Sequence, residues 1–304
     1  MKIPHPIPYQ GSKRNLAHAI LSYFPRKIDT LFEPFTGSAA ISLAAATQGL
    51  AKHYYLNDLN APLMELWKAI IHTPDTIARQ YEQLWKAQQP DKRQYYNIVR
   101  QKFNTTHRPE YFLYLLARCV KASVRYNAQG EFNQSPDNRR KGMAPKTMRL
   151  QIQGASSLLK GRTTCSSRDY RDVIQKATPA DLIYMDPPYQ GVCKHRDPRY
   201  FSHVPFHEFV DALAWLNARN IRFLVSYDGR TGIKVHGREL PGQLNLLRVE
   251  LHAGRSTQAT LLGKTASTYE SLYLSPALAH DIEIEPIIYE NEPPVQMCLL
   301  ETTE

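Results

Sequence analysis

The chain has 304 residues, of which 42% are hydrophobic and 22% charged, and this composition excludes an intrinsically disordered protein. The sequence has neither an apolar run of about 18 residues nor an apolar N-terminal signal core, so we expect a cytoplasmic protein with no membrane partner. The formal net charge of +10 at pH 7 is compatible with a polyanionic partner such as nucleic acid, or with a basic protein that has none.

The first sixty residues show patterns of two strands with a helix between them. Short runs of mostly apolar and aromatic residues predict strands over Thr30–Phe35 and His53–Leu56, and the alanine-rich stretch Ala39–Ala46 favours a helix. A turn of small residues around Gly37 joins the first strand to the helix, and Asp58 follows the second strand. This order of elements is typical of the opening of a doubly wound α/β sheet.

Residues 61–150 have a helical pattern instead. Apolar side chains recur at helical spacing over 63–71, 77–85 and 111–124, and no convincing strand pattern interrupts them. A block of helices within an α/β pattern predicts an added subdomain. We expect an α/β catalytic domain at 1–60 and 151–280, a helical insert at 61–150 and an acidic tail at 281–304.

Strand patterns return in the second half of the chain. Leu182–Met185 and Ile221–Tyr227 have the composition of buried strands, and an amphipathic helix over Phe206–Leu216 lies between them. Two later strands, Leu246–Leu251 and Tyr269–Leu274, are expected to form an antiparallel edge of the sheet. The fold class predicted from these patterns is α/β.

The most informative chemistry follows the strand Leu182–Met185, in the sequence Asp186-Pro187-Pro188-Tyr189. Residues at the carboxyl end of such a strand face the crevice where open α/β sheets bind ligands. The two prolines hold the backbone extended and lack backbone N–H groups, so that the backbone at these two positions offers hydrogen-bond acceptors and no donors. A carboxylate, rigid carbonyls and an aromatic ring suit a planar substrate that bears an amino group. The alternative is a proline-kinked turn that only ends a strand.

The turn around Gly37 is a second candidate ligand site. Small residues allow a ligand to approach the backbone, and Asp58 lies where a Rossmann-like fold places the acid that binds ribose hydroxyls. The full glycine fingerprint of dinucleotide sites is absent, which disfavours a dinucleotide. An ordinary strand-to-helix turn remains the alternative.

Metal chemistry is not expected. The eleven histidines lack metal-ligand spacing, and the four cysteines (Cys119, Cys165, Cys193 and Cys298) are too far apart for a zinc pair and too sparse for a disulfide framework.

In their order along the chain, these motifs resemble the DNA adenine methylase family, whose members methylate adenine N6 with S-adenosylmethionine. Tyr9 and Lys13 match the family's opening motif, residues 33–39 its cofactor loop, Asp58 its ribose-binding acid and residues 186–189 its catalytic motif. The resemblance covers roughly residues 5–275. It implies a Rossmann-like methyltransferase sheet with an inserted, mainly helical target-recognition domain.

The resemblance also implies roles for single residues. The catalytic residues would be Asp186, Pro187, Pro188 and Tyr189. The residues that bind S-adenosylmethionine would be Tyr9, Lys13, Glu33, Phe35, Gly37, Asp58, Asp169 and again Asp186. The residues that bind double-stranded DNA would be Arg125, Tyr126, Asn127 and Asn133, similar to the family's DNA-contacting hairpin, together with Arg139, Arg140 and Lys141.

Charge supports a DNA partner for the insert. Between Arg118 and Arg149, eight basic residues outnumber Glu131 and Asp137, which gives this stretch a net charge of +6. We expect phosphate contacts here, with a solvated charged surface as the alternative. The basic loop 190–203 is expected to cover the flipped base or hold its phosphates, or else to be merely solvated.

Two departures from the family pattern leave alternatives open. Ala39 stands where the cofactor loop usually has a second glycine, and the residues after Asn133 differ from those of GATC-specific members. The alternatives are transfer to cytosine N4 or to RNA, and a non-catalytic DNA-binding relative. We expect a monomer, with the modification arm of a restriction–modification system as one setting.

Overall fold

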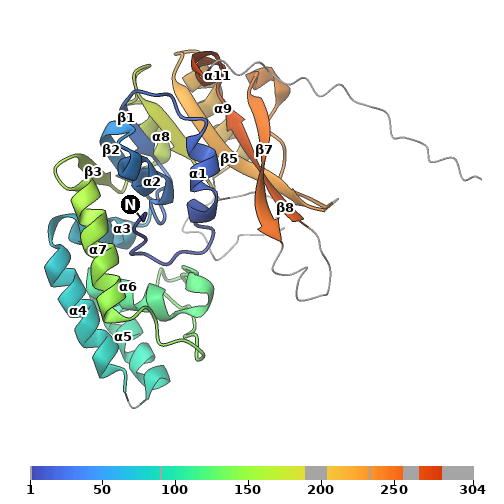
Figure 1. The fold of residues 1–304 in the computed structure, drawn as a ribbon. Coiled ribbons are helices and arrows are strands. Elements are labelled where there is room, and N and C mark those ends of the chain that lie inside the picture. The colour runs from blue at the N-terminus through green and yellow to red at the C-terminus, as the bar shows by residue number, and fades with distance from the viewer. Residues whose placement is uncertain (1, 90, 189–203, 233, 256–266, 283–304) are drawn as a thin grey trace, which may run out of the picture.

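A computed structural model describes residues 2–89, 91–188, 204–232, 234–255 and 267–282 of the chain (Figure 1). Its centre is one sheet with the strand order β3-β2-β1-β4-β5-β8-β7, and β6 pairs with β5. The strands are β1 Ile28–Glu33, β2 Ala51–Asn57, β3 Thr163–Ser166, β4 Leu182–Met185, β5 Arg222–Thr231, β6 Lys234–His236, β7 Leu247–Arg255 and β8 Ser267–Leu274.

Most of the sheet is parallel. Strands β3, β2, β1, β4 and β5 run in one direction, whereas β6, β7 and β8 add antiparallel pairs beyond β4. The predicted α/β class and the predicted antiparallel edge are therefore confirmed. The carboxyl ends of β1, β2 and β4 lie along the same edge of the sheet, which brings the residues after them together.

Helices cover both faces of this sheet. They are α1 Ala17–Leu21, α2 Ala40–Gln48, α3 Ala61–His72, α4 Pro74–Ala87, α5 Lys92–Thr106, α6 Pro109–Arg118, α7 Pro145–Leu159, α8 Tyr170–Ile174, α9 Phe206–Asn217 and α11 Pro276–Asp281. Three short 3-10 helices are η1 Lys13–Asn15, η2 Val120–Ala122 and η3 Gly242–Leu244. Among the described residues, no helix has the length and apolar character needed to cross a membrane.

Two hydrophobic layers lie on opposite faces of the sheet. Leu31, Leu182 and Tyr184 pack on one face, whereas their neighbours Phe32 and Ile183 pack on the other. This alternation is expected for strands that are buried on both sides. Helices α1, α2 and α3–α7 contribute to the first layer, and helices α8 and α9 to the second.

The helices α3–α7 share their core with the sheet. Trp67 of α3, Phe103 of α5, Phe112 of α6 and Met148 of α7 belong to the same buried cluster as Leu31 of β1. The cluster thus continues from the sheet into the helices, which extend downward from the sheet in Figure 1.

Several predicted elements end at other residues than expected. Helix α7 begins at Pro145 and runs unbroken to Leu159, so the boundary expected at residue 150 lies inside a helix. The helix expected to reach residue 124 ends at Arg118, because Cys119 is extended, and the left-handed Lys121 and Ala122 prevent the helix from resuming.

Candidate active site

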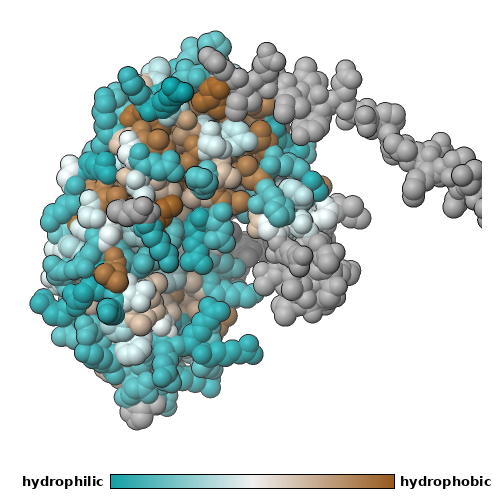
Figure 2. Space-filling model, in the orientation of Figure 1, coloured by the Kyte–Doolittle hydropathy of each residue, from teal (hydrophilic) through white to brown (hydrophobic). Residues whose placement is uncertain are grey.

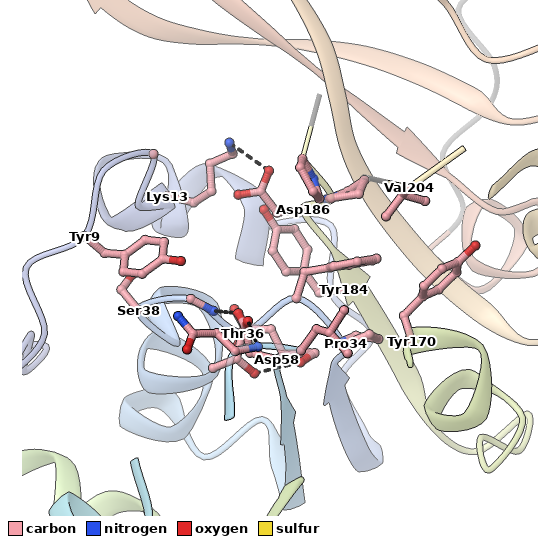
Figure 3. A pocket seen from close by; sticks show the side chains of 18 of the residues that line it. Tyr9, Lys13, Pro34, Thr36, Ser38, Asp58, Tyr170, Tyr184, Asp186 and Val204 are labelled. Atoms are coloured by element: carbon pink, nitrogen blue, oxygen red, sulfur yellow. Dashed lines mark hydrogen bonds and ion pairs between the residues drawn. The ribbon is translucent and has the colours of Figure 1, made fainter. Parts of the chain in front are cut away.

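One cavity of the described structure opens at the carboxyl edge of the parallel strands (Figure 3). Several segments line it, namely residues 9–13 at the start of η1, residues 33–38 and 40 from the end of β1 to the start of α2, residues 58–60 after β2, residue 124, residues 168–171, residue 184 of β4, residues 186–188 after β4, and residues 204, 205 and 208. All eight residues expected to bind the cofactor are in this set. The predicted catalytic residues Asp186, Pro187 and Pro188 line the cavity too, whereas Tyr189 and the loop 190–203 lie outside the described residues.

The β1–α2 turn is tight because of two left-handed residues. Gly37 has a φ of 47° and Ala39 a φ of 49°, and the Ala39 amide donates to the Thr36 carbonyl at 2.7 Å. A Cβ on Gly37 would lie 3.2 Å from the ring of Tyr9, so glycine allows that ring to approach the turn. Ala39 is fully buried and does not line the cavity, so its methyl group does not narrow it.

Asp58 supports the same turn from the end of β2. Its Oδ2 accepts the Gly37 amide at 3.0 Å, and its Oδ1 accepts the Asn60 amide at 3.0 Å. Burial raises the pKa of this carboxyl group above its usual value, and the two amide bonds oppose that rise. On the other side of the turn, Trp67 donates its indole N–H to the Gly37 carbonyl at 3.0 Å.

Glu33 is a buried acid at the end of β1. Its Oε2 accepts the backbone amide of Ser42 at 3.2 Å and the Ser42 hydroxyl at 2.5 Å. Burial, with the nearby charge of Asp186 as a smaller contribution, raises the pKa of Glu33 to about 8. Near neutral pH this side chain is therefore largely protonated and adds little negative charge to the cavity.

Asp186 forms an ion pair with Lys13 across the cavity (Figure 3). The Lys13 Nζ lies 3.0 Å from Asp186 Oδ1 and 3.2 Å from Glu270 Oε2 of β8. The lysine side chain is only 6% exposed, so it is held in place between the two carboxylates. Sequence reasoning missed Glu270, because no pattern along the chain links β8 to a lysine near the N-terminus.

Aromatic rings form the walls of the cavity, with Tyr9 and Tyr170 on opposite sides in Figure 3. The rings of Phe35 and Tyr170 lie 5.2 Å apart, and Tyr170 also packs against Phe209. The preceding residue, Asp169, caps α8 and pairs with Arg171, whose hydrogen bonds lower the pKa of the Asp169 carboxyl group.

The predicted DNA hairpin is present as an antiparallel bridge between Tyr126 and Phe132. Arg125 and Asn133 are exposed on it. The side chain of Asn127, in contrast, binds within the hairpin turn, where it accepts the amide of Glu131 and donates to the carboxylate of the same residue. Its described bonds therefore hold the turn.

Tyr126 points toward the cavity instead of the solvent. Its hydroxyl donates to the side-chain oxygen of Asn60 at 3.1 Å, and burial raises its pKa. Since Asn60 also binds Asp58, the hairpin and the cavity turn are connected by hydrogen bonds. Sequence reasoning missed the role of Asn60, although its place two residues after Asp58 is typical of a turn.

The basic stretch after the hairpin is largely exposed. Arg139, Arg140 and Lys141 are all exposed, and Arg140 lies 3.6 Å from Asp137. Arg118, the first of the eight basic residues of this stretch, is only 1% exposed and donates to the Asp137 carbonyl. It therefore holds the loop and is not part of a phosphate-binding surface.

Within the described residues, no group of three or more His, Cys, Asp or Glu side chains could hold a metal ion. Cys119 and Cys165 are free thiols, and burial raises the pKa of each to about 12. The other two cysteines, at positions 193 and 298, lie outside the described residues.

Comparisons with known proteins agree on one family. A model of the family described as D12 class N6 adenine-specific DNA methyltransferase matches residues 9–250. A DNA N-6-adenine-methyltransferase of Escherichia phage P1 is 28% identical over 242 residues, which cover 74% of this chain and 30% of the phage protein. A DNA adenine methylase of Serratia marcescens is 29% identical over 185 residues, 60% of this chain and 65% of that protein. The chain thus spans less than two thirds of the length of either relative.

Proposed function

Because this chain belongs to the family of D12 class N6 adenine-specific DNA methyltransferases, we propose that it transfers a methyl group from S-adenosylmethionine to the N6 amino group of adenine in duplex DNA. The observation that carries this proposal is the position of Asp186-Pro187-Pro188 in the cavity, with Asp186 fixed by a buried lysine. The adenine would enter this cavity flipped out of the duplex.

The lining of the cavity fits the methyl donor in its chemistry. Aromatic rings at Tyr9, Phe35 and Tyr170 suit packing against its adenine, and the buried carboxylate of Asp58 suits its ribose hydroxyls. Lys13 can bind its carboxylate, and Asp186 its ammonium group. When bound, S-adenosylmethionine supplies an electrophilic methyl group on a positively charged sulfur.

Asp186 and the Pro187 carbonyl would act on the adenine. Its N6 is a weak nucleophile, because its lone pair is delocalised into the ring. Two acceptors that bind the N6 hydrogens hold the amino group in line with the methyl group and favour its pyramidal form. They also stabilise the positive charge that develops on the nitrogen. Since both acceptors are fixed, by an ion pair and by proline, they need little reorganisation during the transfer.

We place target recognition in the helical segment 61–159, and the DNA-facing side at the hairpin and residues 139–141. The support is the exposed basic side chains described there, together with the hydrogen bond that joins the hairpin to the cavity. The name of another relative, modification methylase StsI of Streptococcus sanguinis, makes a restriction–modification setting part of this proposal.

The test is incubation of the protein with labelled S-adenosylmethionine and duplex DNA, followed by nucleoside analysis. We expect the label on N6 of adenine. The variant Asp186→Ala should reduce the rate by at least about 100-fold while DNA binding persists. Asp172→Ala, which removes an exposed carboxylate of α8 that does not line the cavity, serves as the control and should remain active. Label on cytosine, label only on RNA, or no label at all would overturn the proposal.

A further inference from the structure

The ion-pair cluster of Lys13, Asp186 and Glu270 contains one more carboxylate than is needed to neutralise the lysine. Lys13 lies between the two acids, 3.0 Å from Asp186 and 3.2 Å from Glu270. Among these three described groups the charges sum to one net negative charge. Lys13 and Asp186 both line the cavity, so this excess charge acts directly at its wall.

The fold holds Glu270 in this position. On β8, Glu270 pairs in register with Gly229 of β5, next to an irregularity in the register between Ser226 and Gly229. A Cβ at position 229 would collide with the Tyr269 carbonyl, so only glycine allows β8 to approach β5 this closely. The strand pairing therefore fixes the carboxylate of Glu270 against the lysine.

One carboxylate oxygen of Glu270 lacks a hydrogen-bond donor among the described residues. Its Oε2 is buried and accepts no hydrogen bond from a described donor, so its contact with Lys13 is an ion pair only. The Glu270 side chain is 28% exposed, but a carboxylate with one oxygen buried and held only by an ion pair is costly to place there. It becomes favourable when a further positive charge lies nearby.

We propose that Glu270 is a positioning and specificity-determining residue, whose charge makes the cavity favour the cationic methyl donor over its neutral product. This inference rests on the proposed function, since it concerns the same ligand. S-adenosylmethionine and S-adenosylhomocysteine differ only in the methyl group and the charge on sulfur. The extra carboxylate therefore acts on the donor and much less on the product.

The positioning role concerns Asp186. Without Glu270, Lys13 would lose one of the two carboxylates that it contacts and would neutralise Asp186 more completely. With Glu270 present, the lysine is shared and Asp186 keeps more of its negative charge for the donor and for the adenine amino group. Glu270 thus acts through Lys13 and does not itself touch the substrate.

The experiment compares the dissociation constants of the two ligands, measured by calorimetry on the full chain. In Glu270→Gln, binding of S-adenosylmethionine should weaken about threefold to tenfold, whereas binding of S-adenosylhomocysteine changes little. Glu250→Gln is the matched control, because Glu250 is on the neighbouring strand β7 and pairs with Arg230 at 2.8 Å, away from the cavity. It should leave both constants unchanged.

A double variant tests whether net charge is the cause. Lys13→Met combined with Glu270→Gln leaves Asp186 as the one charge of the cluster, the same net charge as in the wild type. Any contact with Lys13 is lost for both ligands equally. The ratio of their two dissociation constants should therefore return to the wild-type ratio. Should Glu270→Gln alone fail to fold, the double variant is compared with Lys13→Met, which keeps both carboxylates. Lys13→Met should then favour S-adenosylmethionine over S-adenosylhomocysteine about threefold to tenfold more than the double variant does, and equal ratios would overturn the inference.

The possible failures can be told apart. If the wild type binds neither ligand, the proposed function fails. If the wild type binds both ligands but Glu270→Gln weakens both equally, or the double variant shifts their ratio, only the inference on Glu270 is overturned.

Discussion

Gly37 has a left-handed backbone conformation and also lies against the ring of Tyr9, and mutations can separate the effects of these two features. Gly37→Ala places a methyl group 3.2 Å from the Tyr9 ring in a left-handed conformation, so it should reduce stability by about 1–2 kcal/mol and weaken S-adenosylmethionine binding several-fold. The control is Gly49→Ala, since Gly49 is left-handed too but has no atom within 4 Å of its added Cβ. It should lower the melting temperature similarly and leave ligand affinity unchanged. Equal affinity losses would contradict the role of the Tyr9 contact.

Glu33 predicts a specific dependence of stability on pH. Its pKa is about 8 in the folded protein and 4.5 when unperturbed, so the folded protein keeps a proton that the unfolded chain releases. The free energy of unfolding should therefore fall as the pH rises from about 4.5 to about 8, by up to about 1.4 kcal/mol per pH unit from this group. Urea unfolding of wild type and Glu33→Gln across this range would show it, because glutamine mimics the protonated acid.

The outcome is read from the difference between the two proteins, since other groups also titrate there. Glu33→Gln should be close to the wild type at pH 5 and more stable than it at pH 8. Glu65→Gln, which removes an exposed carboxylate on α3, should follow the wild-type profile. Parallel profiles for wild type and Glu33→Gln would show that Glu33 is ionised in the folded protein.

At the scale of elements, the Tyr126 hydroxyl is one described connection between the hairpin and the cavity. Tyr126→Phe removes the bond to Asn60 and should reduce stability by about 1 kcal/mol. Because Asn60 supports Asp58, S-adenosylmethionine should also bind more weakly.

The control for this variant is another buried tyrosine of the helical segment. The Tyr96 hydroxyl donates to the Gln134 carbonyl at 2.9 Å and has no part in the Asp58 turn. Tyr96→Phe should lower the melting temperature comparably without weakening ligand binding. If Tyr126→Phe leaves ligand affinity intact, the hairpin and the cavity are energetically independent.

The strands that frame the cavity could be predicted because each combines an apolar run with a distinctive ending. Their apolar runs predicted β1, β2 and β4. Asp58 indicated the carboxyl end of β2, and Asp186 indicated that of β4. Strand β3 was missed, since Thr163–Ser166 is short and only partly buried. Helix α5 was missed as well, because its buried face consists of only Tyr96, Val99 and Phe103 within a polar sequence.

Contacts between distant segments could not be predicted at all. The Lys13–Glu270 and Tyr126–Asn60 pairs depend on which strands and loops become neighbours, and that is decided by the strand order. A single sequence records which residues are present but not which of them meet. The bonds of Asn127 within its own turn could likewise not be predicted from the sequence, and its contact with DNA stays a prediction.

At the scale of the molecule, hydrophilic side chains are spread over more than the proposed DNA face. Hydrophilic side chains cover much of the face drawn in Figure 2, including the region of α4–α6. Exposure alone therefore does not identify phosphate contacts. The edge that carries the cavity provides the distinction, because under the proposed function the bound DNA would place its flipped base there.

Two double variants, each of which removes two positive charges, test whether DNA binds at the edge of the sheet that carries the cavity. Arg139→Ala with Arg140→Ala should weaken DNA binding and reduce the slope of log affinity against log salt by about 0.9 for each phosphate that the protein no longer neutralises. Arg26→Ala with Lys27→Ala removes two exposed charges just before β1, at the opposite edge of the sheet, and should change the slope little. The same slope in both variants would mean that residues 139 and 140 touch no phosphate.

All of the helices α3–α7 lie in the single connection between β2 and β3, and these two strands are neighbours in the sheet. The chain leaves the sheet once and returns once to the adjacent position. A chimaera could therefore exchange this whole segment through only two splice points, with the catalytic strands untouched. The surfaces to be matched would include the packing of α7 on α2, the hydrogen bond from Trp67 to the Gly37 carbonyl and Val124 at the cavity. If the segment reads the DNA, such an exchange would change the target sequence without altering the strands that frame the cavity.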